Sequence, residues 1–233
     1  MATVSYQERR GELQAYFDRT ALDAWARLTS TAPVSRIRAS VRAGRDRMRG
    51  LLLNYLPADL RSRSLLDAGC GTGALSVEAA ERGAAVLAID LSRSLVQLAR
   101  ERLPDAPRPG RVEFRVGDMF DDRLGVFDHV VAMDSLIHYP LPEVVRVLAG
   151  FAARTRFSIV FTFAPRTAAL SLLWAVGRLF PRKDRAPAIE PVAEDDLRLC
   201  LASDPAFRQW RVGRTQYVAG GFYKSQALEL VRT

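Results

Sequence analysis

A strand-like apolar segment that runs directly into three closely spaced glycines most constrains the fold of this chain. The pair Leu65-Leu66 leads into residues 67–73, which read Asp-Ala-Gly-Cys-Gly-Thr-Gly, and a helical pattern begins at Leu75. Glycine lets the backbone turn sharply and approach a ligand closely, and the free N–H groups of a helix start attract anionic groups. The segment therefore predicts a buried strand, a nucleotide-binding loop and a helix.

From Ser64 onward, short apolar runs alternate with helical patterns, which indicates βαβ units and a parallel sheet. Two final strand-like runs flank Gly220-Gly221, a pair suited to a hairpin turn. The predicted fold is therefore α/β, with a Rossmann-like, seven-stranded, mostly parallel sheet and a C-terminal antiparallel hairpin. The expected strands are 64–67, 85–90, 111–116, 127–133, 157–163, 208–218 and 222–231, and the expected helices are 75–82, 94–103, 142–153 and 194–201.

The first 60 residues carry much charge and little strand signal. Residues 12–28 and 34–56 show amphipathic helical patterns that are interrupted near Pro33. We therefore expect a helical N-terminal extension, residues 1–60, that serves as an arm or lid. Residues 61–233 are expected to form the catalytic domain.

The counts of cysteine and histidine and the net charge exclude several classes of protein. The 233 residues include two cysteines, Cys70 and Cys200, and two histidines, so neither a disulfide framework nor a protein-built metal site is expected. No signal peptide or membrane-spanning run is evident, which favours a cytoplasmic protein. The formal charge of +8 fits nucleic acid, an anionic small molecule or an anionic membrane surface as partner, or a solvated basic surface without one.

The glycine loop itself discriminates between cofactors. A dinucleotide-binding pattern can be fitted to Gly69, Gly71 and Ala74, but Asp67 would face a pyrophosphate unfavourably and would suit a cationic ammonium group. The run closely resembles motif I of class I S-adenosylmethionine-dependent methyltransferases. That resemblance implies that S-adenosylmethionine is the cofactor and S-adenosylhomocysteine the product, held by Asp67, Gly69, Cys70, Gly71 and Gly73.

Two later segments fit the same cofactor. Asp90 ends an expected strand, where a carboxylate can accept both ribose hydroxyls, and Leu91 follows it in the predicted cofactor site. Residues 117–119 resemble the adenine-contacting segment of these methyltransferases. The resemblance implies that Asp118 accepts from the adenine amino group and that Met119 covers the ring; a plain turn is the alternative.

The loop after the fourth expected strand should line the acceptor site, because ligands of open α/β sheets lie beyond the carboxyl ends of the strands. It contains Asp134, Ser135, His138 and Tyr139. Methylases of nucleic-acid bases usually carry Asn/Asp-Pro-Pro-Tyr/Phe there, so no nucleic-acid partner is expected. His138 is the candidate catalytic residue, and an ordinary loop histidine is the alternative.

Several segments that are distant in the sequence together resemble one particular family of methyltransferases. Residues 15–20 followed by Trp25, residues 41–45, residues 134–140 and residues 221–225 are together similar to the magnesium-protoporphyrin IX O-methyltransferases of chlorophyll and bacteriochlorophyll synthesis. This family methylates one propionate of a magnesium porphyrin. Thr29 stands where the family leads us to expect a tyrosine, so no acceptor role of that tyrosine carries over.

The chemistry is consistent with this resemblance. A propionate has a pKa near that of glutamate, about 4.3, and needs no strong base at neutral pH. His138 would orient the carboxylate rather than bind magnesium, which prefers oxygen ligands. Tyr16 and Trp25 would bind the porphyrin, although packing of the arm onto the sheet explains them equally well.

The resemblance also implies partners beyond the magnesium porphyrin, namely a magnesium chelatase subunit and peripheral contact with the photosynthetic membrane. Residues 168–183 combine apolar side chains with a basic end, and they fit either a membrane interface or a core helix. Three alternatives stay open: an O-methyltransferase for another aromatic or quinone acceptor, an RNA methyltransferase, and a non-catalytic porphyrin escort.

Overall fold

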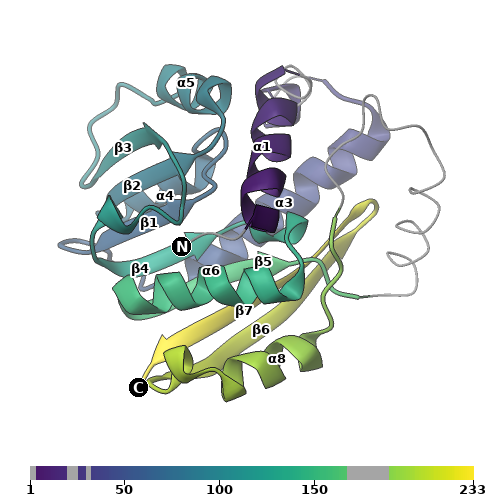
Figure 1. The fold of residues 1–233 in the computed structure, drawn as a ribbon. Helices are drawn as coiled ribbons and strands as arrows, with labels where there is room; N and C mark the ends of the chain where they lie inside the picture. Colours follow the sequence, from purple (N-terminus) through teal and green to yellow (C-terminus); the bar gives the residue numbers. More distant parts are fainter. Residues whose placement is uncertain (1–3, 20–25, 30–32, 167–188) are drawn as a thin grey trace.

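A seven-stranded sheet forms the centre of the molecule (Figure 1). The computed structural model describes residues 4–19, 26–29, 33–166 and 189–233. Five parallel strands are followed by β7, which is antiparallel to both of its neighbours, so the predicted fold class is confirmed. The strand order is β3-β2-β1-β4-β5-β7-β6. The bounds are β1 Ser64–Ala68, β2 Ala85–Asp90, β3 Arg111–Val116, β4 Phe127–Ala132, β5 Thr155–Phe163, β6 Trp210–Gly220 and β7 Tyr223–Arg232.

Helices cover both faces of the sheet, which explains why its central strands are almost continuously apolar. Val130 and Val131, neighbours on the fully buried β4, belong to two different core clusters. One cluster lies beneath α3, α4 and α5, and the other beneath α1, α6 and α8. These helices are α1 Val4–Arg19, α3 Arg36–Tyr55, α4 Ala74–Glu81, α5 Arg93–Glu101, α6 Leu141–Arg154 and α8 Glu194–Ser203.

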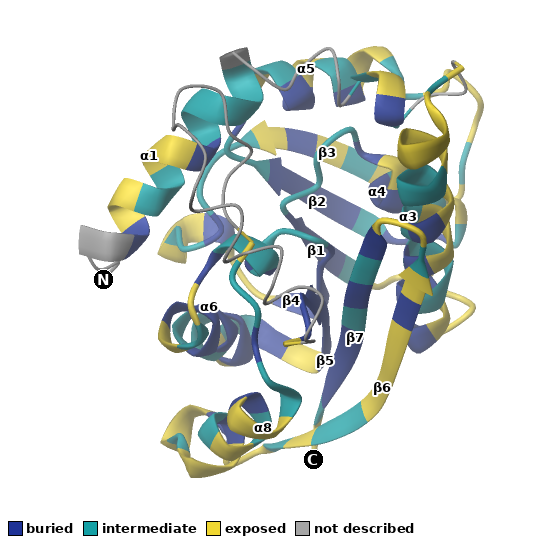
Figure 2. Ribbon diagram, turned by 90° about the vertical axis from the view of Figure 1, so that its right-hand side faces the viewer, coloured by how far each residue is buried: buried dark blue, intermediate teal, exposed yellow. Residues whose placement is uncertain are grey.

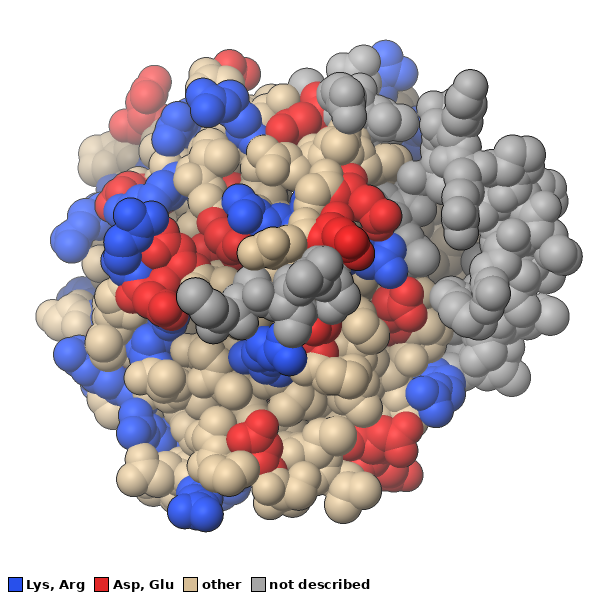
Figure 3. Space-filling view, viewed as in Figure 1, with Lys and Arg blue, Asp and Glu red and all other residues tan. Residues whose placement is uncertain are grey.

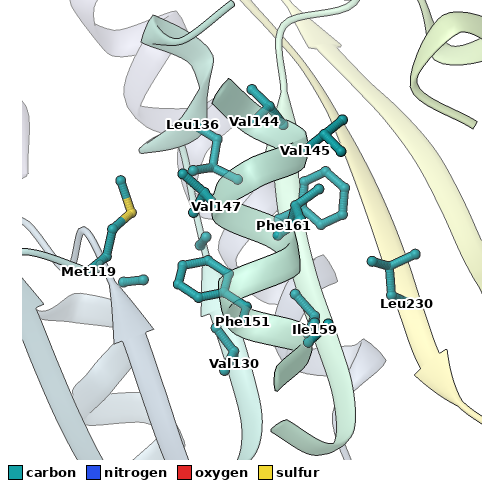
Figure 4. Packing of buried hydrophobic residues seen from close by; sticks show 14 of the residues in the cluster. Met119, Val130, Leu136, Val144, Val145, Val147, Phe151, Ile159, Phe161 and Leu230 are labelled. Atoms are coloured by element: carbon teal, nitrogen blue, oxygen red, sulfur yellow. The ribbon is translucent and has the colours of Figure 1, made fainter. Parts of the chain in front are cut away.

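The packing of α6 illustrates the second cluster (Figure 4). Val144, Val147 and Phe151 lie on the helix face that meets Val130 and Ile159 of the sheet, and all five are at most 1% exposed. The edge strand β6, by contrast, is exposed along most of its length (Figure 2). The strands β1, β4 and β5 therefore form the buried centre of the sheet.

The N-terminal helices are integral to these clusters. Tyr6 and Leu13 of α1 are buried in one cluster, and Met48 and Leu52 of α3 in the other. The first helix begins at Val4, earlier than the predicted residue 12, because its apolar face is completed by Tyr6. The division of the chain near residue 60 into an arm and a domain stays a prediction.

Local signals set several element ends. Ser35 caps α3 by accepting from the Arg38 N–H, and Gly83 follows α4 with φ +101°, as a helix-ending glycine should. Gly220 ends β6 and pairs with Tyr223, so the β6–β7 turn consists of Gly221 and Phe222, one residue beyond the predicted Gly220-Gly221. Gly221 has a φ of +56°. Within the described ranges, no helix has the length and apolar character needed to cross a bilayer. The apolar segment 168–183 lies outside those ranges.

Two glycines of α3 test the packing of this helix on β7. A Cβ at Gly44 would lie 2.6 Å from Tyr223 Cβ, whereas a Cβ at Gly50 would meet nothing within 4 Å. We predict that Gly44→Ala lowers the free energy of unfolding by about 1–3 kcal/mol through overpacking. Gly50→Ala should raise it by about 0.5–1 kcal/mol through helix propensity. Urea unfolding checks both, and equal effects of the two substitutions would contradict the packing.

Candidate active site

A cavity of about 340 Å³ opens at the carboxyl ends of the parallel strands. The loops after β1, β2, β3 and β4 line one side of it, and α1, α3 and the start of β7 line the other. This is the edge where ligands of open α/β sheets bind. On the face seen in Figure 3, acidic and basic side chains are interspersed, with no continuous basic stripe of the kind that tracks a nucleic-acid backbone.

The glycine loop forms the floor of this cavity. Gly69, Gly71 and Gly73 all have positive φ, at 87°, 55° and 81°, a region that side chains disfavour. A Cβ at Gly69 would collide with Ser135 of the β4 loop, so the two loops can touch only because residue 69 is glycine. The amides of Gly69 and Cys70 donate to the Ile89 carbonyl at 2.8 and 3.0 Å, which holds the loop against β2.

Asp90 lies at the tip of β2 beside this loop. Its Oδ2 accepts from the Gly71 N–H at 2.9 Å, and its Oδ1 accepts from the Ser92 N–H at the same distance. Burial raises the pKa of this carboxyl, while the two N–H bonds oppose the shift. Each carboxylate oxygen keeps a further lone pair, and Asp90 and Leu91 both line the cavity.

Asp67 lies one layer deeper, at the end of β1. It is 1% exposed, and Ser76 Oγ of α4 donates to its Oδ2 at 2.5 Å. Burial raises the pKa of this carboxyl to about 7, and the nearby Asp90 adds to the shift. A cation placed beside the loop would favour the ionised forms of both carboxyls.

A second cavity, of about 510 Å³, adjoins the first behind the glycine loop. The two share Arg45, Gly69 and Met133, and the second is also lined by Asp67 and Cys70. Its remaining polar lining includes Arg42, Asp46, Arg49 and Thr72. An extended ligand that crosses the loop can therefore meet Asp90 at one end and arginines of α3 at the other.

The residues that follow β3 differ in what they contact: two line the cavity, and one binds α1. Gly117 and Met119 line the main cavity near Ile89 and Leu91. Asp118 is not among the lining residues, because its carboxylate accepts from Tyr6 Oη at 2.7 Å and from the Phe120 N–H at 2.9 Å. Arg10 of α1 lies 3.4 Å from the same carboxylate. The predicted contact of Asp118 with adenine stays a prediction.

Asp134, on the acceptor side, has φ +53° and is hydrogen-bonded to side chains from several elements. It accepts from Arg45 Nη1 at 2.6 Å and from Tyr223 Oη at 3.0 Å, and Ser225 Oγ lies 3.3 Å away. Its N–H donates to Thr162 Oγ1 at 2.7 Å. Burial and the Asp134 charge raise the pKa of Tyr223, which keeps that hydroxyl a donor. The carboxylate thus joins α3, β4 and β7.

The other predicted acceptor residues also reach the cavity. Ser135, His138 and Tyr139 line it, and Ser135 Oγ is buried without a hydrogen-bond partner in the described part of the chain. Tyr139 is 1% exposed because its ring stacks on Tyr6 at 5.2 Å. Burial raises its pKa.

Aromatic residues of α1 complete the acceptor side. Tyr16 and Phe17 line the cavity edge to face, with ring centroids 5.2 Å apart. The ring of His138 lies 6.4 Å from that of Phe17. Trp25, also expected at the acceptor, lies outside the described residues.

Sequence reasoning missed Arg45, Tyr223 and Lys224 as site residues, although it singled out the segments 41–45 and 221–225. No periodic pattern marks a residue of a remote helix or hairpin as cavity-lining. Charge within these segments could have marked Arg45 and Lys224, but no local signal marks Tyr223.

The residues present fit S-adenosylmethionine. The glycine loop leaves room for close approach, Asp90 offers acceptors at the position expected for ribose, and the orphaned Ser135 hydroxyl faces the same space. The cationic ammonium group would lie near Asp67 and Asp90, two carboxyls whose pKa values are raised chiefly by burial and whose ionised forms a cation would favour.

Comparisons with known proteins agree with this geometry. Residues 132–232 match the family model for the magnesium-protoporphyrin IX methyltransferase C-terminus, and residues 65–156 match a methyltransferase domain. The chain is 50% identical over 225 residues to magnesium-protoporphyrin O-methyltransferase from Rhodobacter capsulatus, spanning 96% of this chain and 97% of that protein. The protein of that name from Synechocystis sp. is 30% identical over 220 residues, 94% of each chain.

Solved structures and more distant relatives extend the comparison. A crystal structure of magnesium protoporphyrin IX methyltransferase from Synechocystis with bound S-adenosylhomocysteine superposes with a TM-score of 0.80 at 28% identity, covering 96% of this chain and all of that one. A ubiquinone biosynthesis O-methyltransferase from Xanthomonas oryzae is 35% identical, but over only 140 residues, 56% of this chain and 58% of that protein.

The buried Asp67 predicts a pH dependence of stability. Its pKa rises from 3.8 to about 7 on folding, so between these values the folded state holds a proton that the unfolded state has lost. The contribution of Asp67 to stability therefore falls as pH rises through this window. We predict that, without ligand, Asp67→Asn changes the free energy of unfolding little at pH 4 and raises it by up to a few kcal/mol at pH 8.

Urea unfolding of both proteins at the two pH values measures this effect. Asp121→Asn is the control, because Asp121 is only partly buried and hydrogen bonds from Arg123 lower its pKa to about 2. The shift of its pKa, from 3.8 to about 2, has the opposite sign to that of Asp67, so the effect of Asp121→Asn on stability should change little between pH 4 and pH 8, and any change should be opposite in direction. A pH-independent difference between wild type and Asp67→Asn would contradict the buried, protonated Asp67.

Proposed function

The chain belongs to the magnesium-protoporphyrin O-methyltransferase family and is an S-adenosylmethionine-dependent methyltransferase, and from this premise we propose that it methylates one propionate of magnesium protoporphyrin IX. The products are the monomethyl ester and S-adenosylhomocysteine. The observation that carries the proposal is a single cavity that joins the glycine loop and Asp90 to His138 and the aromatic side chains of α1.

The cofactor would lie across the glycine loop. Asp90 would accept from the ribose hydroxyls, while Leu91 and Met119 would cover the adenine ring. Asp67 would balance the methionine ammonium group through the loop, and Arg45, which lies in both cavities, would bind the methionine carboxylate. When bound, the cofactor supplies an electrophilic methyl group on a sulfonium.

The reaction requires little acid–base catalysis by the protein. A propionate oxygen forms the new C–O bond as the S–C bond breaks, and the sulfonium charge and the carboxylate charge cancel. The nucleophile is ionised at neutral pH, so what the site must do is align the two reactants and exclude water. His138 would donate an N–H to the second oxygen of the carboxylate and so orient it.

The N-terminal arm would close the porphyrin side of the site. Tyr16 and Phe17 present aromatic surface to the cavity, as a large apolar ring requires. The arm is tied to the cofactor side by Tyr6, whose hydroxyl donates to Asp118. A lid formed by residues 1–60 is consistent with these contacts.

Two finer elements belong to the same proposal. The porphyrin would be received from a magnesium chelatase subunit, and the protein would contact the photosynthetic membrane peripherally while remaining otherwise cytoplasmic. Support for an apolar surface at the mouth of the cavity comes from Phe222, which is 67% exposed at the tip of the β6–β7 turn. Sedimentation with vesicles containing anionic lipid tests the membrane contact, which Phe222→Ser should weaken.

The product provides the test of the proposed function. Purified protein with S-adenosylmethionine and magnesium protoporphyrin should yield a porphyrin one methyl group heavier by mass spectrometry. Mild alkali should return the starting porphyrin and methanol, because an ester hydrolyses where an aryl ether or N-methyl group does not. An alkali-resistant product, or no product, would contradict the proposal.

His138 provides a second prediction. Because it lies on the acceptor side, His138→Ala should lower kcat by about ten- to hundredfold while calorimetry shows cofactor affinity within about twofold of wild type. His138→Gln, which keeps an N–H donor, should recover part of the rate. Loss of cofactor affinity with normal turnover at saturation would show that the assigned role is wrong.

A further inference from the structure

Lys224 lines the cavity, and neither cofactor binding nor orientation of the reacting carboxylate, as proposed above, involves it. It lies on β7, two residues beyond Phe222 at the turn, in one cavity with Ile137, Ala164 and Ile189. Its neighbours Tyr223 and Ser225 both approach Asp134. Because side chains alternate along a strand, Lys224 projects from the opposite face of β7, away from Arg45 and Asp134.

The face that carries Lys224 can be followed along the strand. Gln226, which shares it, contacts Glu194 of α8. His138 and the aromatic residues of α1 line the same cavity as Lys224. The cavity therefore has two cationic positions, Arg45 on the α3 face of β7 and Lys224 on the α8 face.

Lys224 takes part in no ion pair within the part of the chain that the structure describes. Every ion pair found there is made by an arginine. Lys224 also donates no hydrogen bond there, and its side chain is half-buried. A lysine without a carboxylate partner in the described part of the chain, on the wall of a largely apolar cavity, is suited to an anionic group of a ligand.

We propose that Lys224 binds the propionate of the substrate that is not methylated, an inference that rests on the proposed function. The porphyrin carries two propionates, and only one can reach the methyl group. The other would otherwise enter an apolar cavity as an unpaired charge, at a cost in binding free energy. A compact ammonium on a flexible stem can follow this carboxylate without constraining the ring.

This assignment explains why one ester forms rather than two. After the first transfer, the product holds a single free carboxylate. A second methylation would require that carboxylate to face the cofactor, which leaves an uncharged ester at Lys224 and an ammonium without a partner. Lys224 thus makes the dicarboxylate the preferred substrate.

The test compares ligands that differ only in their free carboxylates. Magnesium protoporphyrin IX, its monomethyl ester and its dimethyl ester are titrated by fluorescence quenching against the full chain with S-adenosylhomocysteine. Lys224→Met should weaken binding of the diacid by about ten- to thirtyfold and that of the dimethyl ester by less than twofold. Lys224→Arg should retain most of the preference for the diacid.

Two further measurements make the result decisive. Arg208→Met, which removes an exposed positive charge outside the cavity, controls for the change in net charge and should leave the preference intact. In assays, Lys224→Met should raise KM for the diacid with kcat nearly unchanged and should reduce the rate ratio of diacid to monoester.

Equal weakening for all three porphyrins, or none, would overturn the proposal. A loss in kcat rather than in binding would also overturn it, because Lys224 would then hold the reacting carboxylate. Since the binding titration needs no turnover, it tests Lys224 even if wild-type protein forms no ester, an outcome that would contradict the proposed function instead.

Discussion

The buried carboxylate of Asp134 joins the parts of this molecule that make the site. It lies at the end of β4 and accepts from Arg45 of α3 and from Tyr223 of β7, residues 89 positions away on either side in the chain. Removing one member of such a network would leave buried charges or hydroxyls without partners, which costs far more than an exposed pair contributes. Helix α3 and the C-terminal hairpin are thereby held over the strand ends, where the cofactor must bind.

The second constraint is the close approach of two loops. Gly69 lies so near Ser135 that only a glycine fits, and this contact brings the β1 loop, which serves the cofactor, against the β4 loop, which serves the acceptor. Transfer of a methyl group requires the two reactants to meet in line within van der Waals distance. The close approach of Gly69 to Ser135 provides that proximity, and alignment of this kind suits an acceptor that is already ionised.

Much of this could be predicted from sequence, for reasons that differ by element. The apolar runs of β1, β2 and β4 and the glycine loop are local signals, and the structure confirms the sheet that they predict. The start of α1 was missed because Tyr6 is buried by tertiary contacts, among them its ring contacts with Phe120 and Tyr139. Asp118 illustrates the same limit, since its bond to Tyr6 joins residues 112 positions apart. Arg45, Tyr223 and Lys224 become site residues only when the sheet order places β7 beside β5.

The central claim is that one cavity aligns a cofactor sulfonium with a porphyrin carboxylate between the β1 and β4 loops. A crystal structure of the protein with S-adenosylhomocysteine and magnesium protoporphyrin tests it most directly. We expect the ribose hydroxyls to bind Asp90 and the sulfur atom to lie beside Gly69 and Ser135. One propionate oxygen should face that sulfur, with His138 bound to the same carboxylate. A porphyrin bound elsewhere, or a cofactor whose sulfur faces away from the acceptor cavity, would contradict it.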